Sequence, residues 1–539
     1  MTSIDLFKLN EKQISELALK LINNKQYNQA EILLLEAIKK INKSHYLLNH
    51  LGYLYFEKGE LDKSINYYGL SIKIQNNNRE AYCNMGTAYL CKNEFGLSKE
   101  IFEKGLKVLP NNENILLAYS QLLFAIKDTK KAFEAFESRK KTNQYVSILQ
   151  NLKMPEWTGE DLNNKSILIL SEQGIGDTIQ FSRYLFELQN KFSVKIIFKV
   201  RKQLQYLFKN FKFQVIGPLD KIPETDYYQC LMSLPSIFYK LESKLVPNYN
   251  YFKRNEKLIN FWGNKIEKLK GYKVGLCWQG DPGYGRDFMR SIPLHNFEKL
   301  FLIPNLNFIN LTKGIGNEQI KNFKFKNKLS DFSKEIDNGE NSFEDTIAIL
   351  ENIDLLITSD TAIVHVASTM NKKTWLLLDS SADWRWHLET EKFRWYDYQK
   401  SFRQKKINSW DNVINEVVKN LTRVKNEFIN LKQNVFKMID LSLSLNSKPI
   451  LVTQRTKRWQ IINDKVLSIS VSEDYYSREK KISDIIIAGC KEKKAICIDG
   501  FSIIKFDDDD TYDLVHTTPK GSEKIADVLF DQIGYINFN

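Results

Sequence analysis

Hydrophobic and small residues recur at a fixed interval of 34 positions through the first 141 residues of the chain. Gly52 and Gly86 lie 34 positions apart, and a tyrosine follows each of them three positions later. In each repeat a small residue is followed four positions later by a large one, at Ala30 and Leu34, Ser64 and Tyr68, Ser98 and Phe102, and Ala132 and Phe136. Small residues facing large ones let two helices pack closely, so the pattern predicts four helical hairpins. The hairpins would start near Glu11, His45, Arg79 and Glu113.

This period, with its alternation of small and large positions, resembles the tetratricopeptide repeat. The resemblance implies an α-solenoid of about four repeats over residues 1–145, with a concave groove that binds a partner or an acceptor polypeptide. Packing of the repeats against the next domain and self-association are two alternatives. The sequence leaves all three open.

From Ser166 onward the pattern changes to short apolar runs, each followed by a helical stretch, which is typical of a parallel sheet flanked by helices. The first run is Ser166–Leu170, and a glycine-rich turn and an amphipathic stretch follow it. A second unit opens with a run at 273–278, and further runs follow at 306–311, 353–358 and 374–378. The sequence therefore predicts two α/β domains, residues 150–265 and 270–435, with a cleft between the facing carboxyl ends of their strands.

The most informative of these runs ends at Ile357 and is followed by four small or polar residues and then by a helical pattern. Such a turn points unpaired backbone N–H groups at one spot, where the dipole of the following helix favours negative charge. His365 lies one helical turn past Thr361, so it can face the same spot. The segment 359–365 therefore predicts a corner that holds phosphate.

The composition is that of a globular protein, with 43% hydrophobic and 27% charged residues. The net charge is +13, but lysine is spread along the whole chain. A nucleic-acid-binding patch is therefore not indicated, whereas a basic cleft for an anionic ligand is compatible with the charge.

The six cysteines form no CxxC pair, which favours buried reduced thiols in the cytosol over a zinc site or a set of disulfides. The N-terminus lacks the apolar core of a signal peptide, and no run of 18 apolar residues occurs, so we expect no transmembrane segment. These features predict a cytoplasmic protein, with a peripheral position at the inner membrane face as an alternative.

Three blocks of the α/β region together resemble the heptosyltransferase-like glycosyltransferases of family 9. They are Glu172–Asp177, Arg290–Leu294 and Ser359–His365. Asp383–Trp386 and Ser401–Gln404 are similar to the subgroup that carries N-terminal tetratricopeptide repeats. The resemblance covers roughly residues 151–424 and the repeats. It implies a GT-B fold of two Rossmann-like domains, sugar transfer with inversion, no metal or other cofactor, and a nucleotide-diphospho-sugar donor.

Sugar transfer with inversion needs a base for the acceptor hydroxyl and stabilisation of the leaving diphosphate. Asp177 matches the catalytic base that the resemblance implies, and a helix-capping role is the alternative. Gly176 beside it would let the acceptor approach. The donor diphosphate site would be formed by Asp360, Thr361, Ala362 and His365, with capping and core packing as alternatives. The heptosyltransferases proper have glycine where Ala362 stands, and alanine tolerates fewer backbone conformations.

Four further residues are candidates for the same site. Lys313 and Arg290 could bind phosphate as cations, or could be solvated surface charges. Trp384 and Trp386 could stack on a sugar or a base, or could belong to a core.

Residues 445–539 predict a small C-terminal α/β piece, in which Asp513 and His516 resemble the end of an SGNH-type esterase. The serine block of that family does not lie upstream, so this pair has no nucleophile and an appended degenerate domain is the expected role.

The leading hypothesis is an inverting glycosyltransferase whose acceptor is a bacterial surface glycan, a lipid-linked glycan or a protein, with the repeats recruiting an acceptor or a partner. A non-catalytic repeat scaffold and a protein O-glycosyltransferase are the alternatives.

Overall fold

The computed structural model of the chain describes residues 9–41, 43–242, 245–246, 248, 250–338, 342–381, 383, 385–386, 388, 395–396, 399–407, 409–444, 450–452, 459–462, 465–468, 483 and 496–498. The chain divides into two compact units. The first comprises Met1–Lys268, Val274–Phe301 and Phe308–Glu416, and it contains the repeats and the candidate site. The second comprises Leu269–Lys273, Leu302–Asn307 and Val417–Asn539.

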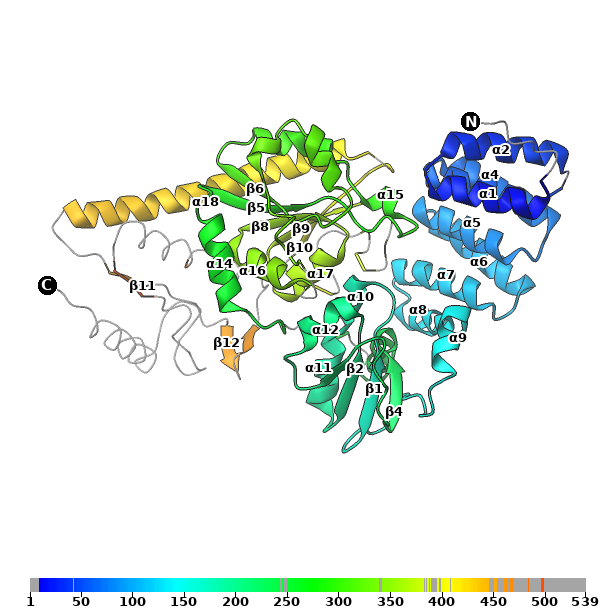
Figure 1. Ribbon diagram of the computed structural model, residues 1–539, viewed down its shortest axis with the longest axis horizontal. Coiled ribbons are helices and arrows are strands. Elements are labelled where there is room, and N and C mark those ends of the chain that lie inside the picture. The colour runs from blue at the N-terminus through cyan, green and yellow to red at the C-terminus, as the bar shows by residue number, and fades with distance from the viewer. Residues whose placement is uncertain are drawn as a thin grey trace. The chain divides into compact units, whose positions relative to one another are not determined.

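The N-terminal region is an array of helical hairpins (Figure 1). Its helices are α1 (Glu11–Asn23), α2 (Tyr27–Lys40), α3 (His45–Glu57), α4 (Leu61–Ile74), α5 (Arg79–Cys91), α6 (Phe95–Val108), α7 (Glu113–Ala125) and α8 (Thr129–Phe136). Helices α3 and α4 pack so closely that a Cβ at Gly52 would lie 2.5 Å from the Tyr68 ring. A Cβ at Gly86 would lie 2.5 Å from the Phe102 ring in the next hairpin. The small and large positions of the 34-residue pattern therefore face each other as predicted.

The turns inside the hairpins repeat with the same period. Lys25, Gly59, Asn93 and Lys127 all have a positive φ, between 58° and 75°. Each of these residues ends the first helix of its hairpin in the left-handed conformation, which starts the tight turn into the second helix. The four hairpins are therefore four copies of one local structure.

The first α/β domain is a parallel sheet in the order β3-β2-β1-β4, flanked by helices (Figure 1). Its strands are β1 (Ser166–Leu170), β2 (Lys195–Lys199), β3 (Gln214–Ile216) and β4 (Tyr227–Cys230). Its helices are α10 (Ile175–Phe181), α11 (Arg183–Lys191), α12 (Lys202–Phe208) and α13 (Leu234–Glu242). The central strand β1 is apolar because both of its faces are covered, and Ile167, Leu168 and Ile169 are fully buried.

The second α/β domain follows the helix α14 (Glu256–Ile266) and has a sheet in the order β10-β9-β8-β5-β6-β7. Its strands are β5 (Tyr272–Cys277), β6 (Leu306–Asn310), β7 (Leu329–Asp331), β8 (Leu355–Ser359), β9 (Thr374–Leu378) and β10 (Gln399–Arg403). Its helices include α15 (Asp287–Arg290), α16 (Glu344–Asn352) and α17 (Ala362–Thr369). The strand β8 leads directly into α17, as the pattern around Ile357 predicted.

The helix α18 (Asp411–Ser444) leads out of this domain. Beyond it, β11 (Ile450–Val452) pairs in parallel with β14 (Ile496–Ile498), and β12 (Trp459–Ile462) pairs antiparallel with β13 (Lys465–Ser468). None of the helices in the described residues has the length and apolarity needed to cross a bilayer. The predicted class, an α-solenoid followed by parallel-sheet α/β domains, is confirmed.

Candidate active site

The helices α10 and α17, one from each α/β domain, lie against each other (Figure 1). The two helices approach closely at Gly176, where a Cβ would lie 2.7 Å from Cδ2 of His365 and 3.5 Å from Cα of Ala362. Both helices begin here, since α10 starts at Ile175 and α17 at Ala362. The structure therefore brings Gly176 and His365 together from segments almost 190 residues apart in the sequence.

Asp177 lies in the first turn of α10, and its side chain is 12% exposed. One carboxylate oxygen, Oδ2, accepts a hydrogen bond of 3.0 Å from the backbone N–H of Gly174. The other, Oδ1, forms an ion pair with Arg385 of the second α/β domain. Asp177 is therefore not the N-cap residue of α10, which is Gly174, but the third helical residue, and its carboxylate accepts from the N–H of the N-cap residue. Its second oxygen contacts the opposite domain.

Arg385 was not predicted as a site residue, although it lies inside the Asp383–Trp386 block. Its side chain is 15% exposed and also approaches Asp383 Oδ1 at 3.5 Å. Asp360 is a third carboxylate close enough to interact with it electrostatically. Its position between two tryptophans, in a block that resembles family 9, could have marked Arg385 as a candidate. Its ion-pair partner Asp177 could not have been predicted from the sequence.

The carboxylates of Asp360 and Asp383 interact with each other as well as with Arg385. Burial and the neighbouring Asp383 raise the pKa of Asp360 to about 6, against the opposing effects of Arg385 and Arg290. Burial would also raise the pKa of Asp383, but Arg385 and Arg286 outweigh it and hold that pKa below its ordinary value. Arg385 is therefore the cation with which Asp177, Asp383 and Asp360 all interact, and Arg290 and Arg286 add positive charge beside it.

His365 is 4% exposed, and its Nδ1 lies 3.0 Å from the hydroxyl of Tyr396. Its ring stacks on Trp386, with the centroids 5.5 Å apart and the planes at 22°. Burial, reinforced by Arg385 and Arg183, holds the pKa of His365 well below its ordinary value. The imidazole of His365 is therefore neutral. Trp386 is fully buried, so its ring faces protein rather than solvent.

The N-terminus of α17 is the corner that the sequence predicts to hold phosphate. Thr361 is its N-cap residue in an extended conformation, and within the described residues no side chain caps the helix. The Thr361 hydroxyl instead lies 3.8 Å from the Cys277 sulfur. Ala362 is helical and is absent from the residues with positive φ, so its conformation does not require the glycine of the heptosyltransferases.

Arg290 ties the glycine-rich loop after β5 to this corner. Its Nη1 donates a 2.9 Å hydrogen bond to the backbone carbonyl of Asp360, and its Nε lies 3.0 Å from Asp287 Oδ1. A Cβ at Gly280 would lie 2.6 Å from its Nη2, so the glycine makes room for the guanidinium. In this structure Arg290 therefore positions the corner through the backbone of Asp360.

Of the remaining candidates, only Lys313 is among the described residues. The Lys313 ammonium donates to the carbonyl of Ile336, to the carbonyl of Asp337 at 3.3 Å and to Asn338 Oδ1 at 3.3 Å. Trp384, Asp513 and His516 lie outside the described residues. Within the described part of the chain, no three His, Cys, Asp or Glu side chains are grouped so that they could hold a metal ion.

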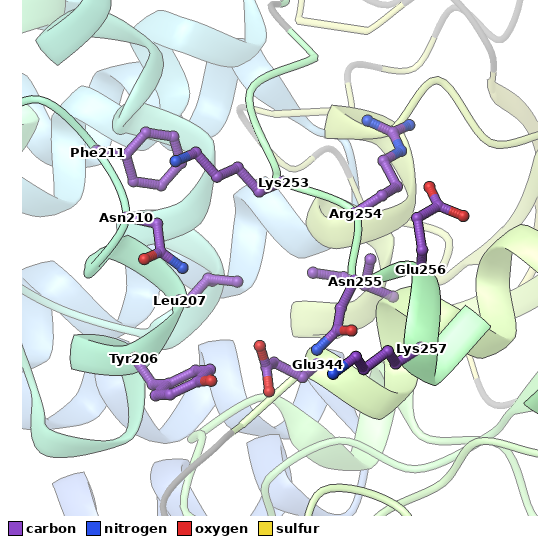
Figure 2. A pocket seen from close by; sticks show the side chains of 11 residues that line it. Tyr206, Leu207, Asn210, Phe211, Lys253, Arg254, Asn255, Glu256, Lys257 and Glu344 are labelled. Carbon is purple, nitrogen blue, oxygen red and sulfur yellow. The ribbon is translucent and has the colours of Figure 1, made fainter. Parts of the chain in front are cut away.

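A cavity of about 330 Å³ lies apart from these residues, between α12, the segment before α14 and the start of α16 (Figure 2). Figure 2 shows Tyr206 and Glu344 pointing toward each other across it. Its charged lining is mixed, with Lys253, Arg254 and Lys257 beside Glu256 and Glu344. None of the predicted site residues lines this cavity, and its mixed charge favours no ligand class.

The fold and this geometry define a helical-repeat protein joined to two parallel α/β domains. The chain contains tetratricopeptide repeats, since a family profile described as TPR repeat matches residues 52–92 and one described as Tetratricopeptide repeat matches residues 80–112. The chain is similar to Protein FlbA of Caulobacter vibrioides, with 23% identity over 398 aligned residues, and the match covers 69% of this chain. It spans 66% of the length of that relative.

Two solved structures of glycosyltransferases are similar to the α/β region. For the E. coli ADP-heptose lps heptosyltransferase II, the match covers 49% of this chain and 99% of that one, with 12% identity and a TM-score of 0.34. For a family 9 glycosyl transferase of Veillonella parvula, it covers 50% of this chain and 100% of that one, with 11% identity and a TM-score of 0.39. These likenesses are too distant to transfer the role of any residue.

Proposed function

We propose that the protein is an inverting glycosyltransferase that moves a sugar from a nucleotide-diphospho-sugar to a hydroxyl group. The observation that carries the proposal is the convergence of Asp177, Arg385 and the N-terminus of α17 at the contact between the two α/β domains. The ordered blocks that resemble family 9 add support, because each of them contributes to this one place.

In this proposal Asp177 is the base. The acceptor oxygen bonds to the anomeric carbon while the bond from that carbon to the donor phosphate breaks, and the hydroxyl proton passes to the carboxylate. The hydrogen bond from Gly174 holds Oδ2 in place, so Oδ1 is the oxygen that receives the proton. The nucleoside diphosphate leaves with the bonding electrons.

The leaving diphosphate takes its stabilisation from the second α/β domain. The first backbone N–H groups of α17 point at the anion, and Arg385 supplies a full positive charge. Arg290 fixes the turn by holding the Asp360 carbonyl, and a neutral His365 supports the start of α17 by packing. A metal ion has no role in this scheme, because the helix and the guanidinium supply the positive charge.

The ion pair between Arg385 and Asp177 couples binding of the donor diphosphate to activation of the acceptor hydroxyl. A bound diphosphate competes with Asp177 for the guanidinium, because both are anions within reach of one cation. Binding of the donor therefore frees the carboxylate that the acceptor hydroxyl needs. The proposal predicts that the donor binds before the acceptor.

The acceptor in this proposal is a bacterial surface glycan, a lipid-linked glycan or a protein, and the repeats recruit it or a partner protein. We place the reaction in the cytoplasm or at the inner face of the membrane. A repeat scaffold without turnover is the second candidate. It is favoured by the structure in one respect, since Asp177, Arg290 and Lys313 all have protein partners.

A thermal-shift panel of nucleotide sugars tests the proposal. We expect nucleoside diphosphates and their sugars to raise the melting temperature, because a ligand at free concentration L that binds only the folded state stabilises it by RT ln(1 + L/Kd). Sugar donors with a single phosphate should not raise it, because the proposed corner binds a diphosphate. Turnover of the stabilising donor then separates an enzyme from a scaffold. If no nucleoside diphosphate raises the melting temperature, the scaffold is the better description.

A further inference from the structure

The repeat array ends against the first α/β domain, in the short 3-10 helix η2 (Glu137–Lys141) that follows α8. Arg139 of this turn is 1% exposed, and its side chain reaches Glu172. Its Nε and Nη2 lie 2.8 and 2.7 Å from Glu172 Oε1, and Nη2 also donates a 2.8 Å hydrogen bond to Ser233 Oγ. Glu172 follows β1 and Ser233 follows β4, so Arg139 joins the carboxyl ends of both strands.

Glu172 belongs to the base loop, the segment 171–177 that runs from β1 to Asp177. The next residue, Gln173, has a φ of 57°, which is unfavourable for a side chain other than glycine or asparagine. Such a conformation persists only where the surroundings hold it. Arg139 fixes the residue before Gln173, and Tyr145, also beyond the last repeat, shares a side-chain hydrogen bond with Gln173.

The array also contacts the second α/β domain. The Phe56 ring meets Phe288 of α15 edge-on at 5.9 Å, and Phe56 shares an apolar cluster with Cys91 and Met289. Asn93, in the turn after α5, donates a 2.8 Å hydrogen bond to the carbonyl of Ser380. Arg290, which holds the Asp360 carbonyl, directly follows this cluster at the end of α15.

We propose that the repeat array is a brace across the candidate site, with Arg139 as the positioning residue for the base loop. In the first α/β domain, the array holds the base loop that carries Asp177. In the second α/β domain, it contacts α15, whose Arg290 holds the corner at Asp360. Whatever binds in the repeats and changes their curvature would then change the distance between base and corner. The effect on catalysis rests on the proposed function, whereas the effect on the loops does not.

Hydrogen exchange of the whole chain, followed by mass spectrometry, tests the brace without any donor. The double variant Arg139→Met with Glu172→Gln removes the Arg139–Glu172 ion pair without leaving Glu172 as an unpaired buried carboxylate. Glu137, the second carboxylate that Arg139 binds, retains Lys140 as a partner. We expect amide exchange in residues 171–178 to rise about tenfold or more, and exchange in 286–291 to stay unchanged. The variant Phe56→Ser should show the opposite pattern, with faster exchange in 286–291 only.

The matched control is the double variant Arg254→Met with Glu351→Gln, which removes an ion pair of 2.7 Å within the same unit but away from both loops. It should leave both segments unchanged. Unchanged exchange in 171–178 after loss of the Arg139 pair overturns the proposal, and so does an equal rise throughout the chain.

Kinetics distinguish a positioning residue from a merely stabilising one. With a donor found by the thermal-shift panel, loss of the Arg139 pair should lower kcat about tenfold or more and leave the donor KM nearly unchanged, because the base moves and the donor corner does not. Arg139→Lys, which retains one charged hydrogen bond, should recover part of kcat. An effect on KM alone contradicts the proposal. If no donor is found, the exchange result still decides the brace while the proposed function fails.

Discussion

Arg385 binds the Asp177 carboxylate from the opposite α/β domain, and the two side chains are 15% and 12% exposed. Each group is needed as an ion in the proposed reaction, and each neutralises the other in this structure. The pair lies where two helices begin, beside the contact of Gly176 with His365. Substitutions of Asp177 and Arg385 therefore test the proposed base and the proposed diphosphate contact directly.

Asp177→Asn should strongly reduce turnover while the protein stays folded. Asparagine retains an oxygen for the Gly174 N–H but cannot take the acceptor proton, so kcat should fall by about 10²- to 10⁴-fold. Donor binding should not weaken, because Arg385 is released for the diphosphate. Steady-state kinetics and a binding titration with the nucleoside diphosphate measure the two effects.

Asp220→Asn is the matched control for that substitution. Asp220 accepts a 2.7 Å hydrogen bond from the Gly217 N–H, the same three-residue geometry as Asp177 and Gly174, but at an exposed turn. Its turnover should equal that of the unmodified protein. Full turnover by Asp177→Asn would show that another group is the base.

Arg385→Met should weaken binding of the nucleoside diphosphate by about 10- to 100-fold, the size of a lost charge-assisted hydrogen bond. Arg385→Lys should recover part of the affinity, since lysine keeps the charge but not the planar fork. Isothermal titration measures both. Arg254→Met, at the separate cavity, serves as the control and should bind normally. If Arg254→Met loses more affinity than Arg385→Met, the cavity is the donor site.

The repeats and several of the strands could be predicted because they depend on local patterns, whereas the order of the strands within each sheet was not predicted. The 34-residue period locates Gly52 opposite Tyr68, and the apolar runs locate β1 and β8 to within two residues. The strand β4 was missed because it is short and contains the buried polar residue Gln229, which is satisfied by a 2.6 Å hydrogen bond to the Trp157 carbonyl. A prediction from hydrophobic periodicity does not recognise a buried polar residue whose hydrogen-bond partner is distant in the sequence.

The site could be predicted only in part for the same reason. Asp177 and His365 stand in recognisable blocks, but their partners are determined by tertiary contacts. Arg385 lies 208 positions from Asp177, and Arg139 lies 33 positions from Glu172 in a region that reads as the end of a repeat. No pattern in the sequence indicates contacts between residues at these separations, so neither ion pair was predicted.

Gly176→Ala should destabilise the contact between the two α/β domains. Alanine favours a helix over glycine by about 1 kcal/mol, but its Cβ would lie 2.7 Å from a His365 ring that Tyr396 and Trp386 hold in place. Overpacking of this kind costs about 1–3 kcal/mol, so the substitution should lower the free energy of unfolding. Denaturant titration measures the change.

Gly96→Ala is the control for this substitution. Gly96 lies in α6, and a Cβ there would meet no described atom within 4 Å. Only the gain in helix propensity remains, so this variant should be more stable by up to about 1 kcal/mol. Equal effects of both substitutions would mean that His365 moves aside and that the contact is loose.

Glu57→Gln should make the stability of the repeats less dependent on pH. Burial raises the pKa of Glu57 from its ordinary value of 4.5 to about 7, against the opposing effects of Tyr53 and Lys25. Within the described residues its Oε1 is buried and has no hydrogen-bond partner. The folded protein therefore binds the proton more tightly than the unfolded chain, and stability falls as pH rises from about 4.5 to about 7. Glutamine cannot ionise, so it should remove this loss, which is on the order of 1–3 kcal/mol.

Melting temperatures of the two proteins at pH 5 and pH 8 measure the effect. Glu57→Gln should melt at a higher temperature than the unmodified protein at pH 8 and at nearly the same temperature at pH 5. Glu60→Gln is the control with the opposite sign, because Lys63 and Lys58 hold the pKa of Glu60 below its ordinary value. That substitution should slightly lower the melting temperature at pH 8 and never raise it. A Glu57→Gln protein that is less stable than the unmodified one at pH 8 would mean that the ionised carboxylate has a favourable partner in solution.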